Sequence, residues 1–124
     1  MLSWFLKTFG MDGESSSIPL VSPRHAFERM QSEELTLIDV RQPEEWASDG
    51  SPKGANQVAL QGQDFVDQIM DLVTNQKETP IAVCCRSGMR GEKAGRLLQA
   101  SGFTNVINVE GGMMRWVAEK LPVA

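Results

Sequence analysis

The sequence has few cysteines and histidines, the residues that most often cross-link secreted domains and bind metals. It contains 2 cysteines and 1 histidine in 124 residues, and the cysteines, Cys84 and Cys85, are adjacent. Adjacent cysteines do not form the loop-closing disulfides of small secreted domains, because ordinary disulfide geometry needs a wider Cα separation. No cluster of His and Cys has metal-ligand spacing, so we expect neither a metal nor another cofactor. The cysteines therefore favour thiol chemistry.

The sequence also lacks a basic stripe and a long apolar run. The chain has a formal net charge of -4, so we do not expect nucleic acid as a partner. The apolar segment 1–9 is much shorter than the roughly 20 residues that cross a bilayer. The N-terminus has no signal-peptide pattern, so we expect a cytoplasmic protein. We expect residues 1–9 to pack on a protein surface rather than on a membrane.

The length and composition indicate one folded domain. A chain of 124 residues fits the common domain size of about 100 to 150 residues. Residues 10–19 combine Gly, Ser and acidic residues without an apolar period, which is typical of a flexible connector. We therefore predict an apolar N-terminal segment with its connector at 1–17 and a folded domain at 18–124.

Strands and helices alternate along this domain. Short apolar runs rich in β-forming residues predict strands at 35–40, 57–60, 80–84 and 106–109. Capping signals and helical spacing predict helices that start at Pro23, at 43–46 and after Arg90. Two more are predicted over about 63–73 and over 113–120. The helix after Arg90 is expected to place Ala94, Leu97 and Leu98 on one face. The alternation predicts an α/β fold with a mostly parallel sheet and helices on both faces.

Cys85 directly follows the predicted strand 80–84 and precedes a helix. Ligands of open α/β folds bind at the carboxyl ends of the strands, so this position makes Cys85 a candidate nucleophile. Ser87-Gly88 gives the backbone conformational freedom after Cys85. The N–H groups of these residues can therefore form an anion-binding nest around the sulfur. The helix N-terminus, together with Arg86 and Arg90, adds positive charge and favours the thiolate over the thiol.

Three motifs in order resemble the signatures of rhodanese domains. They are Leu37–Arg41 (LIDVR), Cys85–Arg90 (CRSGMR) and the stretch from Gly102 through Glu110-Gly111-Gly112 to Trp116. The resemblance covers about residues 18–121. It implies a rhodanese-like fold, a central, mostly parallel five-stranded sheet flanked by helices on both faces. It also implies a sulfurtransferase in which Cys85 takes sulfur from thiosulfate or a persulfide and passes it to cyanide or a thiol.

The resemblance further implies roles for individual residues. Cys85 is the catalytic residue, and the substrate-binding residues are Arg86, Ser87, Gly88, Met89 and Arg90. Asp39 and Arg41 support the loops around the pocket. The expected partners are a small anionic sulfur donor such as thiosulfate and a sulfur-acceptor protein. This chemistry needs an activated thiolate and positive charge more than a general acid, so we expect His25 to be solvated or part of a helix cap.

One loop departs from the rhodanese pattern. Rhodanese domains usually read Gly-His-Ile-Pro-Gly-Ala after the second helical turn, whereas residues 50–55 read GSPKGA. The missing histidine leaves the structure of this loop open and does not affect the nucleophile.

Two alternative functions stay open. Counted from Cys84, the spacing to Arg90 is the Cys-x5-Arg of cysteine phosphatases and arsenate reductases, although that loop would begin inside the strand and leave Gly91 where phosphatases usually carry a hydroxyl residue. The other alternative is a non-catalytic rhodanese module that binds a partner. We expect Cys84 to be an inert core residue that points away from Cys85. Whether Cys84 takes part in sulfur relay stays open.

Overall fold

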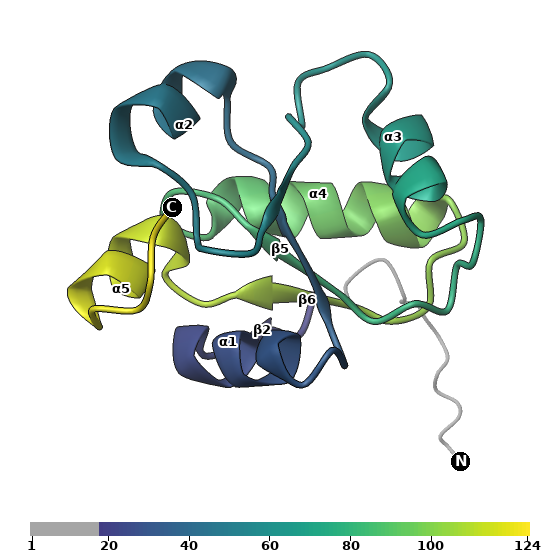
Figure 1. Cartoon of the computed structure of the whole chain (residues 1–124). Coiled ribbons are helices and arrows are strands. Elements are labelled where there is room, and N and C mark those ends of the chain that lie inside the picture. The colour runs from purple at the N-terminus through teal and green to yellow at the C-terminus, as the bar shows by residue number, and fades with distance from the viewer. Residues whose placement is uncertain (1–17) are drawn as a thin grey trace.

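A computed structural model of the chain describes residues 18–124, and the element labels are those of Figure 1. Its five strands are β2 (Leu20–Val21), β3 (Thr36–Asp39), β4 (Asn56–Gln57), β5 (Ile81–Cys84) and β6 (Val106–Val109). They form one sheet in the order β2-β6-β5-β3-β4, and every neighbouring pair is parallel. The expected parallel five-stranded sheet is therefore confirmed.

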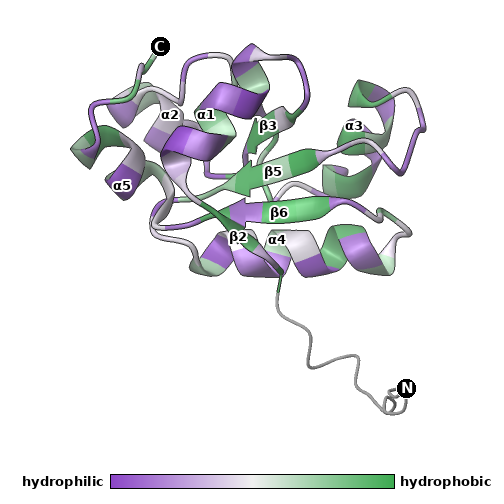
Figure 2. Ribbon diagram, turned by 90° about the horizontal axis from the view of Figure 1, so that it is seen from below, coloured by the Kyte–Doolittle hydropathy of each residue, from purple (hydrophilic) through white to green (hydrophobic). Residues whose placement is uncertain are grey.

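Helices cover both faces of this sheet (Figure 1). In the described residues they are α1 (Pro23–Gln31), α2 (Pro43–Asp49), α3 (Phe65–Leu72), α4 (Met89–Ala100) and α5 (Gly112–Ala118). Helices α1 and α5 lie against one face and α3 and α4 against the other, and each face buries its own apolar cluster. Figure 2 shows the same layers from below, with hydrophobic strands between helices of mixed character. This is the predicted α/β architecture.

The central strand β5 is buried on both faces. Ile81 and Val83 belong to the apolar cluster beneath α3 and α4, whereas Ala82 and Cys84 belong to the cluster beneath α1 and α5. A parallel strand buried on both faces has a continuous apolar sequence, which is why the sequence predicts it. Cys85 lies in the same cluster as Val83, so the expected opposite orientation of the two cysteines is confirmed.

The edge strands are short and differ from the sequence prediction. No strand is predicted at Leu20–Val21, and the strand predicted at 57–60 lies at Asn56–Gln57. Each has two residues, and β2 pairs with β6 while β4 pairs with β3. Two residues are too few to form the apolar run or the alternation from which strands are predicted.

The buried face of α4 also differs from the prediction. Ala94 and Leu98 are buried as expected, but Leu97 is 41% exposed. Two glycines set the buried face: a Cβ on Gly91 would lie 2.1 Å from the side-chain oxygen of Asn108, and a Cβ on Gly95 would lie 2.7 Å from Ile18. The helix therefore packs closely along positions 91, 95 and 98, and Leu97 points away from the sheet.

Helix α1 begins as its sequence predicts. Ser22 is the N-cap, Pro23 opens the helix, and the Ser22 hydroxyl accepts a hydrogen bond from the backbone N–H of His25 at 3.1 Å. The His25 side chain is exposed. The only histidine of the chain is thus solvated and takes part in the cap through its backbone, as expected.

Two further predictions concern the N-terminal segment and membrane-spanning helices. The apolar segment and connector predicted at 1–17 lie outside the described residues, so the division of the chain at residue 18 stays a prediction. Across residues 18–124, none of the helices combines the length and the apolar character that spanning a membrane requires.

Replacing Leu98 and Leu97 separately by alanine tests the observed face of α4. We expect Leu98→Ala to lower the free energy of unfolding by about 2 to 5 kcal/mol, because it empties a fully buried site. Leu97→Ala should cost less than about 1 kcal/mol, since its side chain is partly exposed. Urea unfolding followed by circular dichroism measures both, and equal losses would contradict the observed face.

Candidate active site

The loop that joins β5 to α4 curls around the sulfur of Cys85. Cys85 follows the last residue of β5, and Gly88 is the N-cap of α4. Gly88 has φ of +120°, a backbone conformation that favours glycine. Its N–H donates a hydrogen bond to the Cys85 Sγ at 3.0 Å. The sulfur therefore lies at the N-terminus of a 12-residue helix and accepts a backbone hydrogen bond there.

The N-terminus of α5 holds the outer side of this loop. The backbone N–H of Met113 donates to the carbonyl of Cys85 at 2.7 Å, and that of Met114 donates to the carbonyl of Arg86 at 3.0 Å. This contact requires a glycine at position 112, because a Cβ there would lie 2.3 Å from the Cys85 carbonyl oxygen. The Gly111-Gly112 pair, predicted as a turn, is thus what lets α5 approach the loop.

Asn108 holds the loop from the neighbouring strand β6. Its side-chain amide donates to the Gly88 carbonyl at 2.9 Å, and the residue is 2% exposed. Gly91 leaves the space that this side chain occupies. Asn108 is not among the site residues predicted from the sequence, although a polar residue inside an otherwise apolar strand is an available signal.

The side chains of the predicted substrate-binding loop differ in exposure. Arg86, Ser87 and Met89 are exposed, and Met89 is the most exposed of them at 82%. Gly88 and Arg90 are partly buried. Of these residues, Gly88 contacts the Cys85 sulfur through its backbone N–H, and the side chains of three others are exposed.

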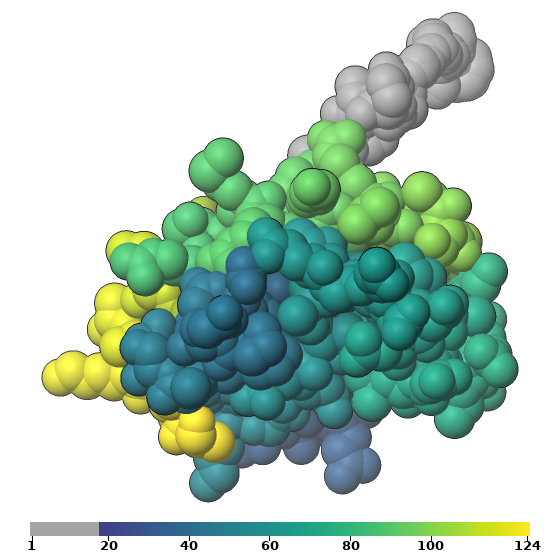
Figure 3. All heavy atoms as spheres, turned by 90° about the horizontal axis from the view of Figure 1, so that it is seen from above, coloured from purple at the N-terminus to yellow at the C-terminus, as the bar shows by residue number. Residues whose placement is uncertain are grey.

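Arg86 and Arg90 have different surroundings. Arg90 forms a two-pronged ion pair with Glu45 of α2, with Nη1 to Oε1 at 2.7 Å and Nη2 to Oε2 at 2.9 Å. The same Glu45 Oε1 accepts from the backbone N–H of Gln42 at 3.0 Å as part of a capping box. In Figure 3 the blue surface that includes α2 adjoins the green surface that includes α4. Arg86 forms no ion pair with any described residue.

These contacts change the ionisation of Glu45. The hydrogen bonds from Arg90 lower the pKa of Glu45 to about 2, although partial burial opposes the change. The same pair raises the pKa of Arg90, and the negative charge of an ionised Cys85 adds to this effect. The Arg90 guanidinium therefore lies within electrostatic reach of Cys85 while its charge is offset by Glu45.

Cys84 lies on the other face of the sheet from Cys85, although both residues are buried. It is fully buried in the apolar cluster beneath α1 and α5, and this burial raises the pKa of its thiol. A thiol that resists ionisation is a poor nucleophile, because the thiolate is the reactive form. The sequence expectation of an inert core cysteine agrees with this position.

Asp39 and Arg41 form a buried ion pair at the end of β3. Arg41 Nε and Nη2 donate to the Asp39 carboxylate at 3.0 and 2.9 Å, and both side chains are fully buried. Arg41 also donates to the Gly50 carbonyl at 2.6 Å and to Asp49 at 3.2 Å. The pair thus joins the end of β3 to the end of α2, as a supporting role for these two residues requires.

Ser51 occupies the position where the rhodanese pattern usually has histidine. Its hydroxyl donates to the Asp39 carboxylate at 2.8 Å and accepts from the Gln57 side chain at 2.9 Å. Ser51 is 4% exposed. A serine with a glutamine partner therefore satisfies the buried Asp39 on this side of the loop.

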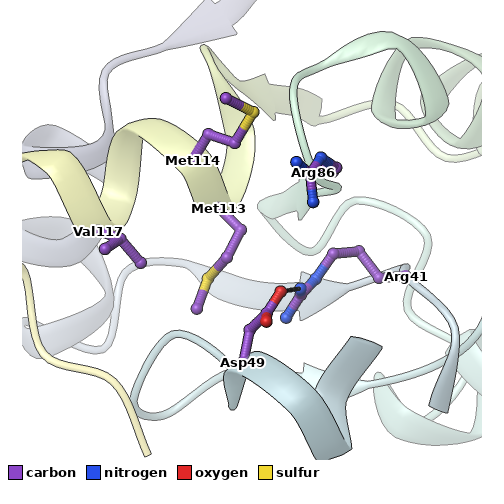
Figure 4. Close-up of a pocket in the computed structure, with 6 residues that line it drawn as sticks. All are labelled: Arg41, Asp49, Arg86, Met113, Met114 and Val117. Atoms are coloured by element: carbon purple, nitrogen blue, oxygen red, sulfur yellow. Dashed lines mark hydrogen bonds and ion pairs between the residues drawn. The ribbon is translucent and has the colours of Figure 1, made fainter. Parts of the chain in front are cut away.

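A pocket of about 390 Å³ opens beside the loop (Figure 4). Its lining residues are Arg41, Asp49, Arg86, Met113, Met114 and Val117. Apolar side chains of α5 lie on one side of the pocket, opposite Arg86 and the Arg41–Asp49 pair. Cys85 does not line this pocket, because its side chain belongs to the cluster beneath α3 and α4. Arg86 is the residue that the pocket and the predicted substrate loop share.

Comparison with known proteins relates the chain to one domain family. The family model described as "Rhodanese-like domain" matches residues 22–119. The candidate sulfurtransferase YtwF of Bacillus subtilis (strain 168) is 40% identical over 90 residues, which cover 73% of this chain and 81% of YtwF. The thiosulfate sulfurtransferase GlpE of Glaesserella parasuis is 29% identical over 83% of this chain and 90% of GlpE.

Other relatives are longer proteins or solved structures. A tRNA uridine(34) hydroxylase of Picosynechococcus is 31% identical over 84% of this chain, and the chain spans 35% of its length. The solution structure of the polysulfide-sulfur transferase homodimer from Wolinella succinogenes superposes with a TM-score of 0.70 at 31% identity. That match covers 86% of this chain and 78% of the Wolinella chain.

The pH dependence of stability tests the Glu45–Arg90 pair. The Glu45 pKa falls from 4.5 to about 2 on folding, so the ionised carboxylate stabilises the folded state above pH 4.5. This contribution is lost as the pH falls from 4.5 to about 2. At neutral pH we expect Glu45→Gln to be less stable than the wild type by roughly 1 kcal/mol, since both partners are partly exposed.

Urea unfolding at neutral pH and at several lower pH values measures this difference. Gln at position 45 can still accept from the Gln42 N–H, so the capping box is retained in the variant. The two proteins should converge in stability as the pH approaches 2. A difference that stays constant over this range would contradict the assignment to an ionised Glu45.

Proposed function

Because the chain belongs to the family of rhodanese-like domains, we propose that it is a sulfurtransferase in which Cys85 carries sulfane sulfur as a persulfide. The observation that supports this most directly is the Cys85 sulfur at the end of β5, which accepts the Gly88 N–H at 3.0 Å in a stretch that carries two arginines. A backbone donor, a helix N-terminus and nearby cations all stabilise a thiolate. The names of YtwF and GlpE also indicate sulfur transfer among relatives of similar length.

The first step transfers sulfur from the donor to Cys85. With thiosulfate as donor, the Cys85 thiolate attacks the outer sulfur, and a bond forms between Sγ and that sulfur. The bond between the two sulfurs of thiosulfate breaks, and sulfite leaves with the electron pair. This step needs no proton transfer and no further oxidant or reductant, which fits a site without a catalytic histidine.

The second step passes the sulfur to an acceptor. Cyanide or a thiolate attacks the terminal sulfur of the Cys85 persulfide, and the bond to Sγ breaks. Thiocyanate or an acceptor persulfide leaves, and the Cys85 thiolate is regenerated. The Gly88 N–H stabilises negative charge at Sγ at the beginning and at the end of this cycle.

The phosphatase alternative fits the observed positions less well. Its Cys-x5-Arg loop would have to begin at Cys84, which lies in β5 and points into the cluster on the other face of the sheet. Burial also raises the pKa of that thiol. Cys85 and the loop after it are therefore the better-supported centre for sulfur chemistry, and a non-catalytic binding module is an outcome of the following test.

Separate replacement of the two cysteines tests the nucleophile. We expect Cys85→Ser to abolish thiosulfate:cyanide sulfurtransferase activity, because Cys85 carries the only thiol of this loop among the described residues. Cys84→Ala should keep most of the activity; alanine is the better replacement there, since a serine hydroxyl would be buried among apolar residues. The readout is thiocyanate formation.

Intact mass spectrometry separates the alternatives. After incubation with thiosulfate, the wild type and Cys84→Ala should gain the mass of one sulfur atom, and cyanide should remove it. Cys85→Ser should gain nothing. A wild-type protein that shows neither the adduct nor thiocyanate formation would support the binding-module alternative and refute the proposed reaction.

Arg86→Ala tests the role of the unpaired cation. We expect kcat/KM for thiosulfate to fall about ten- to hundredfold, because a charge-assisted contact with an anion contributes about 1.5 to 3 kcal/mol. Methanethiosulfonate transfers the same outer sulfur but carries one negative charge fewer, so its kcat/KM should fall less. Equal losses for both donors would mean that Arg86 holds the loop rather than the donor.

A further inference from the structure

The loop presents two arginines to a donor, but their charges are not equally available. Arg90 is held by both carboxylate oxygens of Glu45, at 2.7 and 2.9 Å, and each side chain is less than a third exposed. Arg86 is exposed and has no ion pair among the described residues. A donor that approaches Cys85 therefore meets one free cation and one ion pair.

Glu45 is held in this position by its own helix as well as by Arg90. It lies in the first turn of α2, where the helix N-terminus favours a carboxylate, and Oε1 also accepts from the Gln42 N–H at 3.0 Å. Its carboxylate thus makes three hydrogen bonds. A donor would have to break the two hydrogen bonds from Arg90 to take it from Glu45.

The position of the pair relative to the sulfur gives Glu45 an effect on the donor. Arg90 is the second residue of α4, directly after the loop whose Gly88 N–H donates to Sγ, and a negative charge on Cys85 helps to raise the pKa of Arg90. A carboxylate bound to this guanidinium offsets its attraction for an anion near Cys85. The attraction that is lost in this way grows with the donor's charge, because the Coulomb energy is proportional to the product of the charges.

We propose that Glu45 is a specificity-determining residue that acts through Arg90 and lowers the preference of the site for dianionic donors over donors of lower charge. This inference rests on the proposed sulfur transfer at Cys85 and adds the class of donor. Thiosulfate, a dianion, is disfavoured by Glu45, whereas a monoanionic donor is affected less. The expected favoured donors are therefore sulfane sulfur compounds that carry at most one negative charge at the reacting end.

The experiment compares two donors that differ by one charge. Thiosulfate and methanethiosulfonate both deliver an outer sulfur and release an oxyanion of sulfur, sulfite or a sulfinate. The readout is the ratio of kcat/KM for thiosulfate to kcat/KM for methanethiosulfonate, with cyanide as acceptor. Because both values come from one preparation, a loss of folded protein cancels in the ratio, and so does a general loss of activity.

We expect Glu45→Gln to raise this ratio about tenfold, the order expected for one charge acting at short range on one additional donor charge. Glu45→Asp keeps the charge and should leave the ratio within about twofold of the wild type. The matched control is Glu44→Gln, which removes the same charge from an exposed neighbour in the same helical turn. Its effect should be less than about twofold, because solvent screens an exposed charge.

Each outcome decides the matter. An unchanged ratio in Glu45→Gln would overturn the inference, as would an equal rise in Glu44→Gln, which would reflect overall charge alone. If the wild type transfers sulfur from methanethiosulfonate while the ratio does not move, the proposed function stands and the inference fails. If neither donor loads sulfur on Cys85, the proposed function fails and the inference fails with it.

Discussion

The backbone contact between α5 and the loop after β5 is the constraint on which the candidate site depends. Two N–H groups of α5 donate to the carbonyls of Cys85 and Arg86, and Gly112 makes this approach possible. Because these hydrogen bonds hold the two carbonyls toward α5, the loop can direct the Gly88 N–H toward the sulfur. The last helix of the chain therefore helps to form an anion-stabilising site at the end of the central strand.

Two ion pairs then fix α2 beside this loop. The buried Asp39–Arg41 pair joins the end of β3 to residues that follow α2, and the Glu45–Arg90 pair joins the start of α2 to the start of α4. The first pair is fully buried and fully hydrogen-bonded, so its role is positional. The second lies close to the sulfur, where the same contact that positions a helix also changes the charge available to a ligand.

The parts of the fold predicted from sequence are those with a local signal. The apolar run of β5, the Ser22-Pro23 cap of α1 and the loop at Cys85 each depend on consecutive residues, and each lies where predicted. The two-residue edge strands have no comparable signal. The partners of the site are also distant in sequence: Glu45 lies 45 residues from Arg90, and Asn108 lies 20 residues from Gly88. Such pairs are set by the packing of α2 and β6 around the loop, which no local pattern encodes.

The opposite orientation of the two adjacent cysteines has a consequence for oxidation. Cys84 and Cys85 are the chain's two cysteines, both are free, and they belong to apolar clusters on opposite faces of the sheet. A sulfenic acid is commonly rescued by a nearby resolving thiol that condenses with it to a disulfide. Cys84 is not placed to do this for Cys85. Recovery of an oxidised Cys85 therefore depends on a thiol supplied from outside the domain, and the redox state of this residue follows that of its surroundings.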